Sequence, residues 1–262
     1  MSEFRGLDTD LAPDEVRRTL ETGDFAIVFQ PIVALDTREV GGYEALTRFP
    51  DGRPPNQWFD AAHRCGLGVD LEVAALGKAL LSLPDDGPDF VCLNVSPPAL
   101  MSTDLVEQLQ ARPLGCEVLL ELTEHTSIGD PDVVTRRIAG LRQIGIRVAL
   151  DNVGSGSVSL RHLVDLDPDT IKVDRSLVAK IDRSRANQGL AAALSQLARS
   201  LGWSVIAEGI ETEQELEFCL DSGIGFGQGY LLGRPAPLPG RNEPEHPWVA
   251  WTEEIWQAAN ST

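Results

Sequence analysis

The chain has 262 residues, 42% of them hydrophobic, and a formal net charge of −18. This acidity argues against binding of DNA or RNA polymers, because their phosphates have to be neutralised by cationic side chains. No apolar run approaches the roughly 18 residues of a membrane span, and the polar stretch from Met1 to Asp14 lacks the apolar centre of a secretory signal.

The first third of the chain starts with an expected helix. Pro13 lies in its first turn and Gly23 follows its last, and both are typical of helix boundaries. The second expected strand carries Glu44 and, further along, Arg48. In chain order, the apolar pattern predicts a helix at 13–22, strands at 25–33 and 40–49, and helices at 57–65 and 69–83.

From residue 89 onward, strands and helices alternate. Strand-like apolar runs lie at 89–94, 117–122, 147–150, 170–173 and 203–207, followed by a segment at 225–232. Helices are expected at 104–110, at 131–144, after the glycine-rich loop at 154–156, at 186–201 and at 212–221. Near-continuous apolar strands are typical of parallel strands covered on both faces. The alternation predicts one (β/α)8 barrel, with an open doubly wound sheet as the alternative.

Polar residues lie at or near the carboxyl ends of these strands, namely Glu44, Asn94, Glu121, Asp151, Glu208 and Gln228. Lys172 lies near the end of its own strand. In a barrel, these ends meet on the face that carries the chemistry. Carboxylate and amide oxygens gathered at one point suit a hard cation such as Mg²⁺. The alternative is helix capping, which fits Ser96 and Asp174, but capping favours Ser, Thr, Asp and Asn over Glu.

Short motifs in these strands occur in the order typical of the EAL-domain family. They are Tyr43-Glu44-Ala45-Leu46-x-Arg48, Asn94-Val95-Ser96, Glu121-Leu122-Thr123-Glu124, Asp151-Asn152-x-Gly154, Ile171-Lys172-Val173-Asp174, Ala207-Glu208-Gly209-Ile210-Glu211-Thr212 and Gly227-Gln228-Gly229-Tyr230. From Phe25 to Pro237 the chain thus resembles bacterial phosphodiesterases specific for cyclic di-GMP. The resemblance implies an α/β fold, a TIM-like (β/α)8 barrel whose first strand is antiparallel to the others. It also implies metal-dependent hydrolysis of cyclic di-GMP to linear pGpG.

The resemblance assigns metal-binding, catalytic and substrate-binding roles to residues of this chain. The metal ligands would be Glu44, Asn94, Glu121, Asp151, Asn152 and Glu208, which would hold one or two Mg²⁺ or Mn²⁺ ions. The catalytic residues would be Lys172, Glu44 and Glu208, with Lys172 orienting or deprotonating the attacking water. Substrate contacts would come from Gln30, Arg48 and Gln228, while Glu124 would stabilise the loop after Asp151.

The loop after Asp151 departs from the family pattern, which has two aspartates and later a Phe and a Tyr. This chain reads Asp151-Asn152-Val153-Gly154-Ser155-Gly156-Ser157. Asn152 is neutral where a second metal ion expects a carboxylate. Two functions of different kinds remain open: a phosphodiesterase with a weakened second metal site, or a catalytically impaired cyclic di-GMP receptor. The retained Glu44 and Lys172 favour the enzyme.

We expect three segments: an N-terminal helix within 1–24, the EAL barrel domain at 25–237, and a Pro-rich linker with a short Trp-rich helix at 238–262. In that last helix Trp248, Trp251 and Ile255 share one face, which would pack on the barrel or dock on a partner subunit. The resemblance implies a homodimer. The residues before Phe25 are too few for a sensor domain, so we expect either a stand-alone protein or a fragment.

The four cysteines are far apart and include no Cys-x-x-Cys pair. Cys92 and Cys116 lie in apolar, strand-like runs, which favours buried free thiols. A reducing, cytoplasmic location is therefore expected.

Overall fold

The computed structural model describes residues 11–84, 87–111, 115–122, 131–156 and 159–238. The predicted Trp-rich helix and Glu124 lie outside the described residues.

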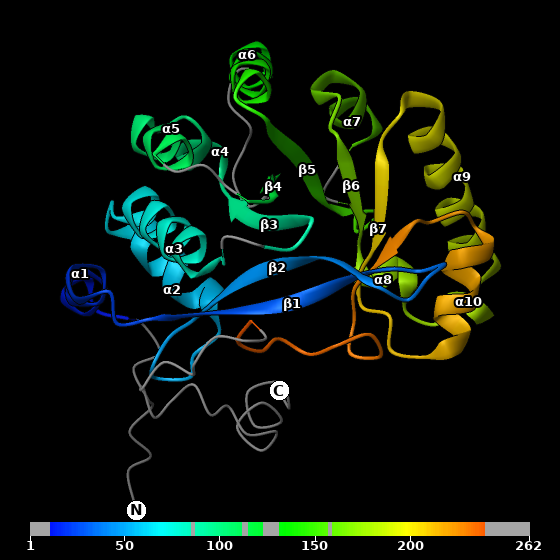
Figure 1. Ribbon diagram of the computed structural model, residues 1–262, viewed down its shortest axis with the longest axis horizontal. Coiled ribbons are helices and arrows are strands. Elements are labelled where there is room, and N and C mark those ends of the chain that lie inside the picture. Colours follow the sequence, from blue (N-terminus) through cyan, green and yellow to red (C-terminus); the bar gives the residue numbers. More distant parts are fainter. Residues whose placement is uncertain (1–10, 85–86, 112–114, 123–130, 157–158, 239–262) are drawn as a thin grey trace, which may run out of the picture.

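In the described part of the chain, eight strands form a closed barrel in chain order (Figure 1). They are β1 (Ala26–Ala34), β2 (Val40–Arg48), β3 (Phe90–Val95), β4 (Glu117–Leu122), β5 (Ile146–Val153), β6 (Thr170–Val173), β7 (Ser204–Ala207) and β8 (Phe226–Gly227). Strand β1 pairs antiparallel with β2 and β8, whereas all other neighbouring pairs are parallel. The predicted barrel and its reversed first strand are confirmed.

Within the described residues, helices lie on the outside of the barrel, in an arc that runs from α1 to α10 and leaves the side below β1 without a helix in this view (Figure 1). They are α1 (Pro13–Thr22), α2 (Pro55–Arg64), α3 (Gly68–Ser82), α4 (Pro97–Leu100), α5 (Thr103–Gln110), α6 (Pro131–Gln143), α7 (Leu160–Leu166), α8 (Arg175–Val178), α9 (Arg185–Leu201) and α10 (Glu213–Asp221), with a short 3₁₀ helix η1 (Ile181–Arg183). The longer helices begin and end within a few residues of their predicted bounds. Among the described helices, α4, α8 and η1 were not predicted.

The capping residues explain two of these short helices. Ser96 precedes α4 and its hydroxyl accepts a hydrogen bond from the Ala99 amide, while Asp174 precedes α8 and its carboxylate accepts one from the Ser176 amide. Both residues therefore cap helices, as the sequence indicated. At the other end of a helix, Gly23 closes α1 with φ +64°, a left-handed conformation that favours glycine.

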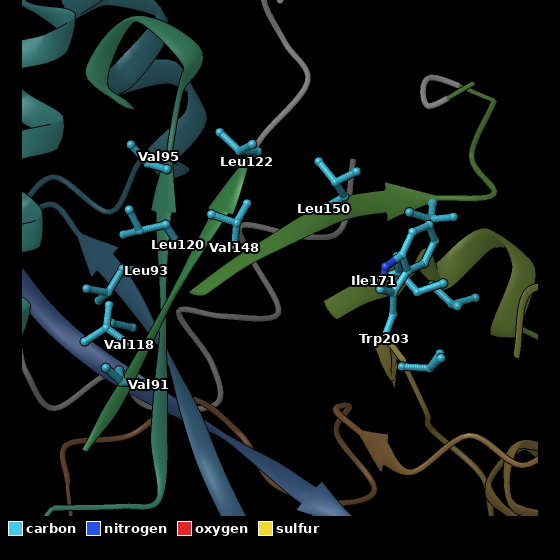
Figure 2. Close-up of a cluster of buried hydrophobic side chains, with 14 of the residues drawn as sticks. Val91, Leu93, Val95, Val118, Leu120, Leu122, Val148, Leu150, Ile171 and Trp203 are labelled. Carbon is cyan, nitrogen blue, oxygen red and sulfur yellow. The ribbon is translucent and has the colours of Figure 1, made fainter. Parts of the chain in front are cut away.

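The barrel strands are buried on both faces. Outward-facing side chains of β3 to β6, together with Trp203, form the main core beneath the helices (Figure 2). The alternate side chains point into the barrel, where Ile32, Cys92, Leu119, Ala149 and Ile206 form a separate apolar layer. The polar residues at the strand ends lie directly above this inner layer, which we call the apolar floor.

The segment after β8 is attached to β1 at both of its ends. Before the segment, Gly227 of β8 pairs with Val33, and after it Ala236 and Phe29 exchange two backbone hydrogen bonds. A side chain at Gly229 would overlap the backbone of Ile210, so glycine is needed where this segment crosses the loop after β7. The chain from 228 to 235 thus forms a closed loop above β1.

All four cysteines are free thiols. Cys92 is fully buried in β3, as predicted, whereas Cys116 is only half-buried because it precedes β4 instead of lying within it. A search of the described helices finds none that is long and apolar enough to cross a membrane.

Candidate active site

The polar residues at the strand ends form a second layer directly above the apolar floor. Side chains two residues apart on a strand share a face, so each floor residue fixes the direction of the polar residue that follows it. The pairs are Cys92 and Asn94, Leu119 and Glu121, Ala149 and Asp151, and Ile206 and Glu208. Neighbouring strands are also in register, with Asn94 opposite Glu121 and Gln30 opposite Glu44.

The Lys172 ammonium lies at the centre of this polar layer. Its Nζ is 3.2 Å from Glu44 Oε2, 2.9 Å from Glu121 Oε2 and 2.8 Å from Glu208 Oε1, and the side chain is 1% exposed. Burial alone would lower the pKa of Lys172, but the negative charges of Glu121, Glu208 and Glu44 raise it well above its ordinary value. Lys172 is therefore a charged ammonium at neutral pH.

The three glutamates around Lys172 differ in their electrostatics. Burial acts to raise the pKa of Glu121, and the Lys172 ammonium 2.9 Å away acts to lower it. Burial likewise raises the pKa of Glu208 to about 7. For Glu44, burial also acts upward, but Lys172 and the amides of Asn94 and Gln228 more than compensate, so its pKa is lowered. Glu44 is thus the most firmly ionised carboxylate of the three.

Glu44 is held by side-chain amide donors from two other parts of the barrel, β3 and the segment after β8. Asn94 Nδ2 donates to Oε1 at 2.9 Å, and Gln228 Nε2 donates to Oε2 at 2.7 Å. Gln228 also donates to Gln30 Oε1 at 3.0 Å, and Gln30 in turn donates to the Gly233 carbonyl at 3.1 Å. These bonds fix the orientation of the Glu44 carboxylate.

Asp151 is engaged by the residue that follows it. The backbone amide of Asn152 donates to Asp151 Oδ1 and its side-chain amide donates to Oδ2, both at 2.8 Å. Asn152 has φ +58°, in the left-handed region that asparagine tolerates better than most residues, and the pairing register of β5 and β6 is interrupted there. Burial raises the pKa of Asp151, while Lys172 lowers it.

Two cavities border the polar layer. The larger, of about 500 Å³, lies between β2, β3, α2 and α3, and its wall includes Arg48, Asn94, His63 and Glu72 beside apolar side chains. Arg48 donates to the Thr47 carbonyl at 2.9 Å, and burial lowers its pKa while Glu44 opposes this. The smaller cavity, of about 210 Å³, is lined by residues that include Gln30, Glu44, Arg175, Glu208, Gln228 and Tyr230.

The donor set fits a divalent cation by its chemistry. Glu121 Oε1 is fully buried and has no hydrogen-bond partner among the residues that the structure describes, and an unpaired buried acceptor costs about 1–3 kcal/mol. A cation bound among Glu44, Asn94, Glu121 and Asp151 would satisfy that oxygen. Within the described ranges, no three His, Cys, Asp or Glu side chains are arranged as a complete ligand set; Lys172 lies among the glutamates instead.

The structure connects most of the predicted site residues by direct contacts. Those joined in one network are Gln30, Glu44, Asn94, Glu121, Lys172, Glu208 and Gln228. Asp151 and Asn152 contact each other, and Arg48 lies in the wall of the larger cavity. Sequence reasoning missed Arg175 and Tyr230, although Tyr230 stands in the same motif as Gln228. It also missed Glu72, whose place within a helix gave no signal.

Comparison with known proteins gives a family for this site. The EAL domain family matches residues 14–235. The chain is 28% identical over 250 residues to PdeB of Escherichia coli (strain K12), named a probable cyclic di-GMP phosphodiesterase. It is 32% identical over 244 residues to NbdA of Pseudomonas aeruginosa, named a cyclic di-GMP phosphodiesterase. These matches cover 90% and 88% of the chain but only 46% and 31% of the relatives, so the chain spans less than half the length of either.

A solved structure agrees with this result. The manganese and cyclic di-GMP complex of Klebsiella pneumoniae BlrP1 is similar with a TM-score of 0.72 and 31% identity, over 81% of this chain and 56% of that one. The barrel, the order of the site residues and the match over residues 14–235 lead to one conclusion. The chain belongs to the EAL domain family.

Proposed function

We propose that this protein is a metal-dependent phosphodiesterase that hydrolyses cyclic di-GMP to linear pGpG. The observation that carries the proposal is the buried network in which Glu44, Glu121 and Glu208 surround Lys172 at the carboxyl end of the barrel. Buried charges of this kind are costly and are a frequent mark of catalytic sites. Membership of the EAL domain family and the names of its relatives point to the substrate.

One or two Mg²⁺ or Mn²⁺ ions would be held by Glu44, Asn94, Glu121 and Asp151, with Asn152 and Glu208 as further ligands. When bound, such an ion supplies a water of lowered pKa and offsets negative charge on the phosphate oxygens. Among the described residues, Glu121 Oε1 has no hydrogen-bond partner, and Asn94 contacts Glu44 through Nδ2 and not through Oδ1. Both oxygens could therefore turn to a cation without breaking these contacts.

The remaining site residues would hold the substrate. Arg48 presents a planar, charged guanidinium beside the larger cavity, a geometry suited to a phosphate oxygen. That cavity, at about 500 Å³ and with walls that include Leu76 and Leu93, falls within the range of small-molecule pockets and suits an aromatic base. Gln228 Oε1 is buried and finds no partner within the described ranges, so it would accept a hydrogen bond from water or ligand.

Lys172 would act as a fixed positive charge. Its pKa is raised by the surrounding carboxylates, so it does not accept a proton at neutral pH in this arrangement. Instead it would hold Glu44, Glu121 and Glu208 together and donate hydrogen bonds towards negative charge that develops on the reacting groups. This role replaces the general base that the family resemblance offered as one alternative.

The second metal site would be weakened. Asn152 adds no negative charge, and its side-chain amide nitrogen already donates to Asp151 Oδ2. If that weakening abolishes turnover, the protein would be a cyclic di-GMP receptor instead, which is the second candidate function. We further propose that the protein acts as a homodimer in the cytoplasm, a compartment that suits its free cysteines.

The test is incubation of the protein with cyclic di-GMP and either Mn²⁺ or Mg²⁺, followed by chromatographic separation of the products. Formation of pGpG that stops on chelation of the metal supports the enzyme. Binding of cyclic di-GMP without any pGpG at saturating metal would instead establish the receptor.

A further inference from the structure

We propose that Glu72 is a positioning residue, whose carboxylate on α3 holds the carboxyl end of β3 and thereby places Asn94 beside Glu44. The inference rests on the proposed function, because it concerns Asn94 as a metal ligand. In the described part of the chain, the hydrogen bonds of the Glu72 carboxylate go to His63 and to the Ser96 amide, so it would touch neither ion nor phosphate.

The carboxyl end of β3 is paired with a strand on one side only, because its pairing with β2 ends before its pairing with β4. Pairing between β2 and β3 ends at Ala45 and Leu93, whereas pairing between β3 and β4 continues to Val95 and Leu122. On the side of β2, the backbone beyond Leu93 therefore lies against the larger cavity instead of a strand. Asn94, the exposed residue of β3, is the first residue after this pairing ends.

The Glu72 carboxylate supplies the missing partner. Its Oε2 accepts a hydrogen bond from the backbone amide of Ser96 at 2.7 Å, and the Glu72 side chain is only 10% exposed. Ser96 then accepts from the Ala99 amide through its hydroxyl and so starts α4. A hydrogen bond from a backbone amide to a carboxylate is shorter and stronger than one between neutral groups, so it can fix the chain direction after Asn94.

Glu72 is itself oriented from α2. Its Oε1 lies 2.7 Å from His63 Nε2. The His63 ring lies so close to Gly68 that a side chain there would overlap it. Both helices and the end of β3 are therefore joined through one carboxylate, and His63, Glu72, Ser96 and Asn94 all line the larger cavity.

A shift of Ser96 would also move Asn94, because the two residues are only two positions apart in the chain. Asn94 Nδ2 donates to Glu44 at 2.9 Å, so a displaced strand end would move both an amide ligand and the contact that orients Glu44. Residues that orient metal ligands typically change metal affinity or activity by about 10–100-fold when they are removed.

The chain offers a matched control at the other end of the barrel. Asp169, which precedes β6, also uses one carboxylate to accept a backbone amide, that of Val148 at 2.9 Å, and also pairs with a basic side chain, Arg142 at 3.2 Å. Loss of Asp169 should cost a similar amount of stability without touching the end of β3.

The experiment compares the full chain with the Glu72→Ala, Glu72→Gln and Asp169→Ala variants. Mn²⁺ affinity is measured by titration calorimetry, and amide hydrogen exchange of residues 90–100 is measured on metal-free protein. We expect Glu72→Ala to weaken Mn²⁺ binding by about 10-fold and to speed exchange at Ser96 and its neighbours. Glu72→Gln should restore both, because its amide oxygen still accepts from Ser96, and Asp169→Ala should change neither.

The inference is overturned if Glu72→Ala leaves both Mn²⁺ affinity and exchange unchanged, or if Asp169→Ala weakens Mn²⁺ binding equally. Failure of the proposed function would look different. Wild-type protein would then form no pGpG, while the exchange comparison on metal-free protein would still decide whether Glu72 holds the end of β3.

Discussion

Replacement of Asn152 by aspartate tests the proposal that a second metal site in this chain is weakened by a missing charge. In metal-free protein, Asn152→Asp removes the hydrogen bond from the Asn152 amide to Asp151 Oδ2 at 2.8 Å. A hydrogen bond to a charged group contributes about 1.5–3 kcal/mol. The substitution also places two carboxylates side by side, and a pair roughly 4 Å apart repels by about 4 kcal/mol at an effective dielectric constant of about 20.

Rotation of the new side chain towards solvent relieves part of that repulsion. A net loss of roughly 2–4 kcal/mol is expected, which lowers Tm by roughly 5–15 °C in a chain of this size. Backbone strain does not contribute, because aspartate tolerates the φ of +58° about as well as asparagine. With Mn²⁺ the sign should reverse, because under the proposed function the two carboxylates would become ligands, so Tm should recover and pGpG formation should rise.

The assay is thermal unfolding of metal-free and Mn²⁺-loaded protein, together with pGpG formation, for wild type, Asn152→Asp and Asn152→Gly. Glycine removes the same amide donor, suits a positive φ and adds no charge. It should therefore destabilise the metal-free protein without any recovery by Mn²⁺. Equal responses of the two variants to Mn²⁺ would refute the reasoning that the missing charge is what weakens the site.

Three further predictions concern individual carboxylates and their partners. Glu44→Ala should lower pGpG formation by at least about 100-fold, and unchanged turnover would remove Glu44 from the metal site. Lys172→Met should destabilise metal-free protein by roughly 3–5 kcal/mol in urea unfolding, because it leaves buried carboxylates without their cation; an unchanged midpoint would contradict this. Burial would raise the pKa of Glu215, but backbone amides of Lys180 and Glu211 lower it below the ordinary 4.5. Its stabilisation is therefore complete above pH 4.5 and lost as the pH falls through its lowered pKa, so Glu215→Gln should flatten the acid limb of the stability curve.

Much of the fold could be predicted because its signals are local. The apolar runs of the strands, and proline and glycine at helix boundaries, place the longer elements within a few residues of their observed bounds. The helices α4 and α8 were not predicted, because four residues are too few to show a helical period. Their caps, Ser96 and Asp174, were nevertheless recognised as caps.

The candidate site could be predicted as a set of residues but not as an arrangement. Polar residues at strand ends identify Glu44, Glu121 and Glu208 because the parallel strands of a barrel bring their carboxyl ends to one face. The position of Lys172 among all three depends on side-chain lengths and strand register, which no spacing along the chain encodes. Glu72 shows the same limit, since its partner Ser96 is 24 positions away in the sequence.

The double attachment of the 228–235 loop to β1 has a mechanical consequence. Because Ala236 is bonded to Phe29 on both its amide and its carbonyl, tension on the chain beyond Leu238 reaches β1 before it reaches Gln228. The next residue in β1 is Gln30, which already bonds Gln228 and the Gly233 carbonyl. A displacement of Ala236 would thus be transmitted to the Glu44 carboxylate through Gln30, the residue after Phe29, and through Gln228.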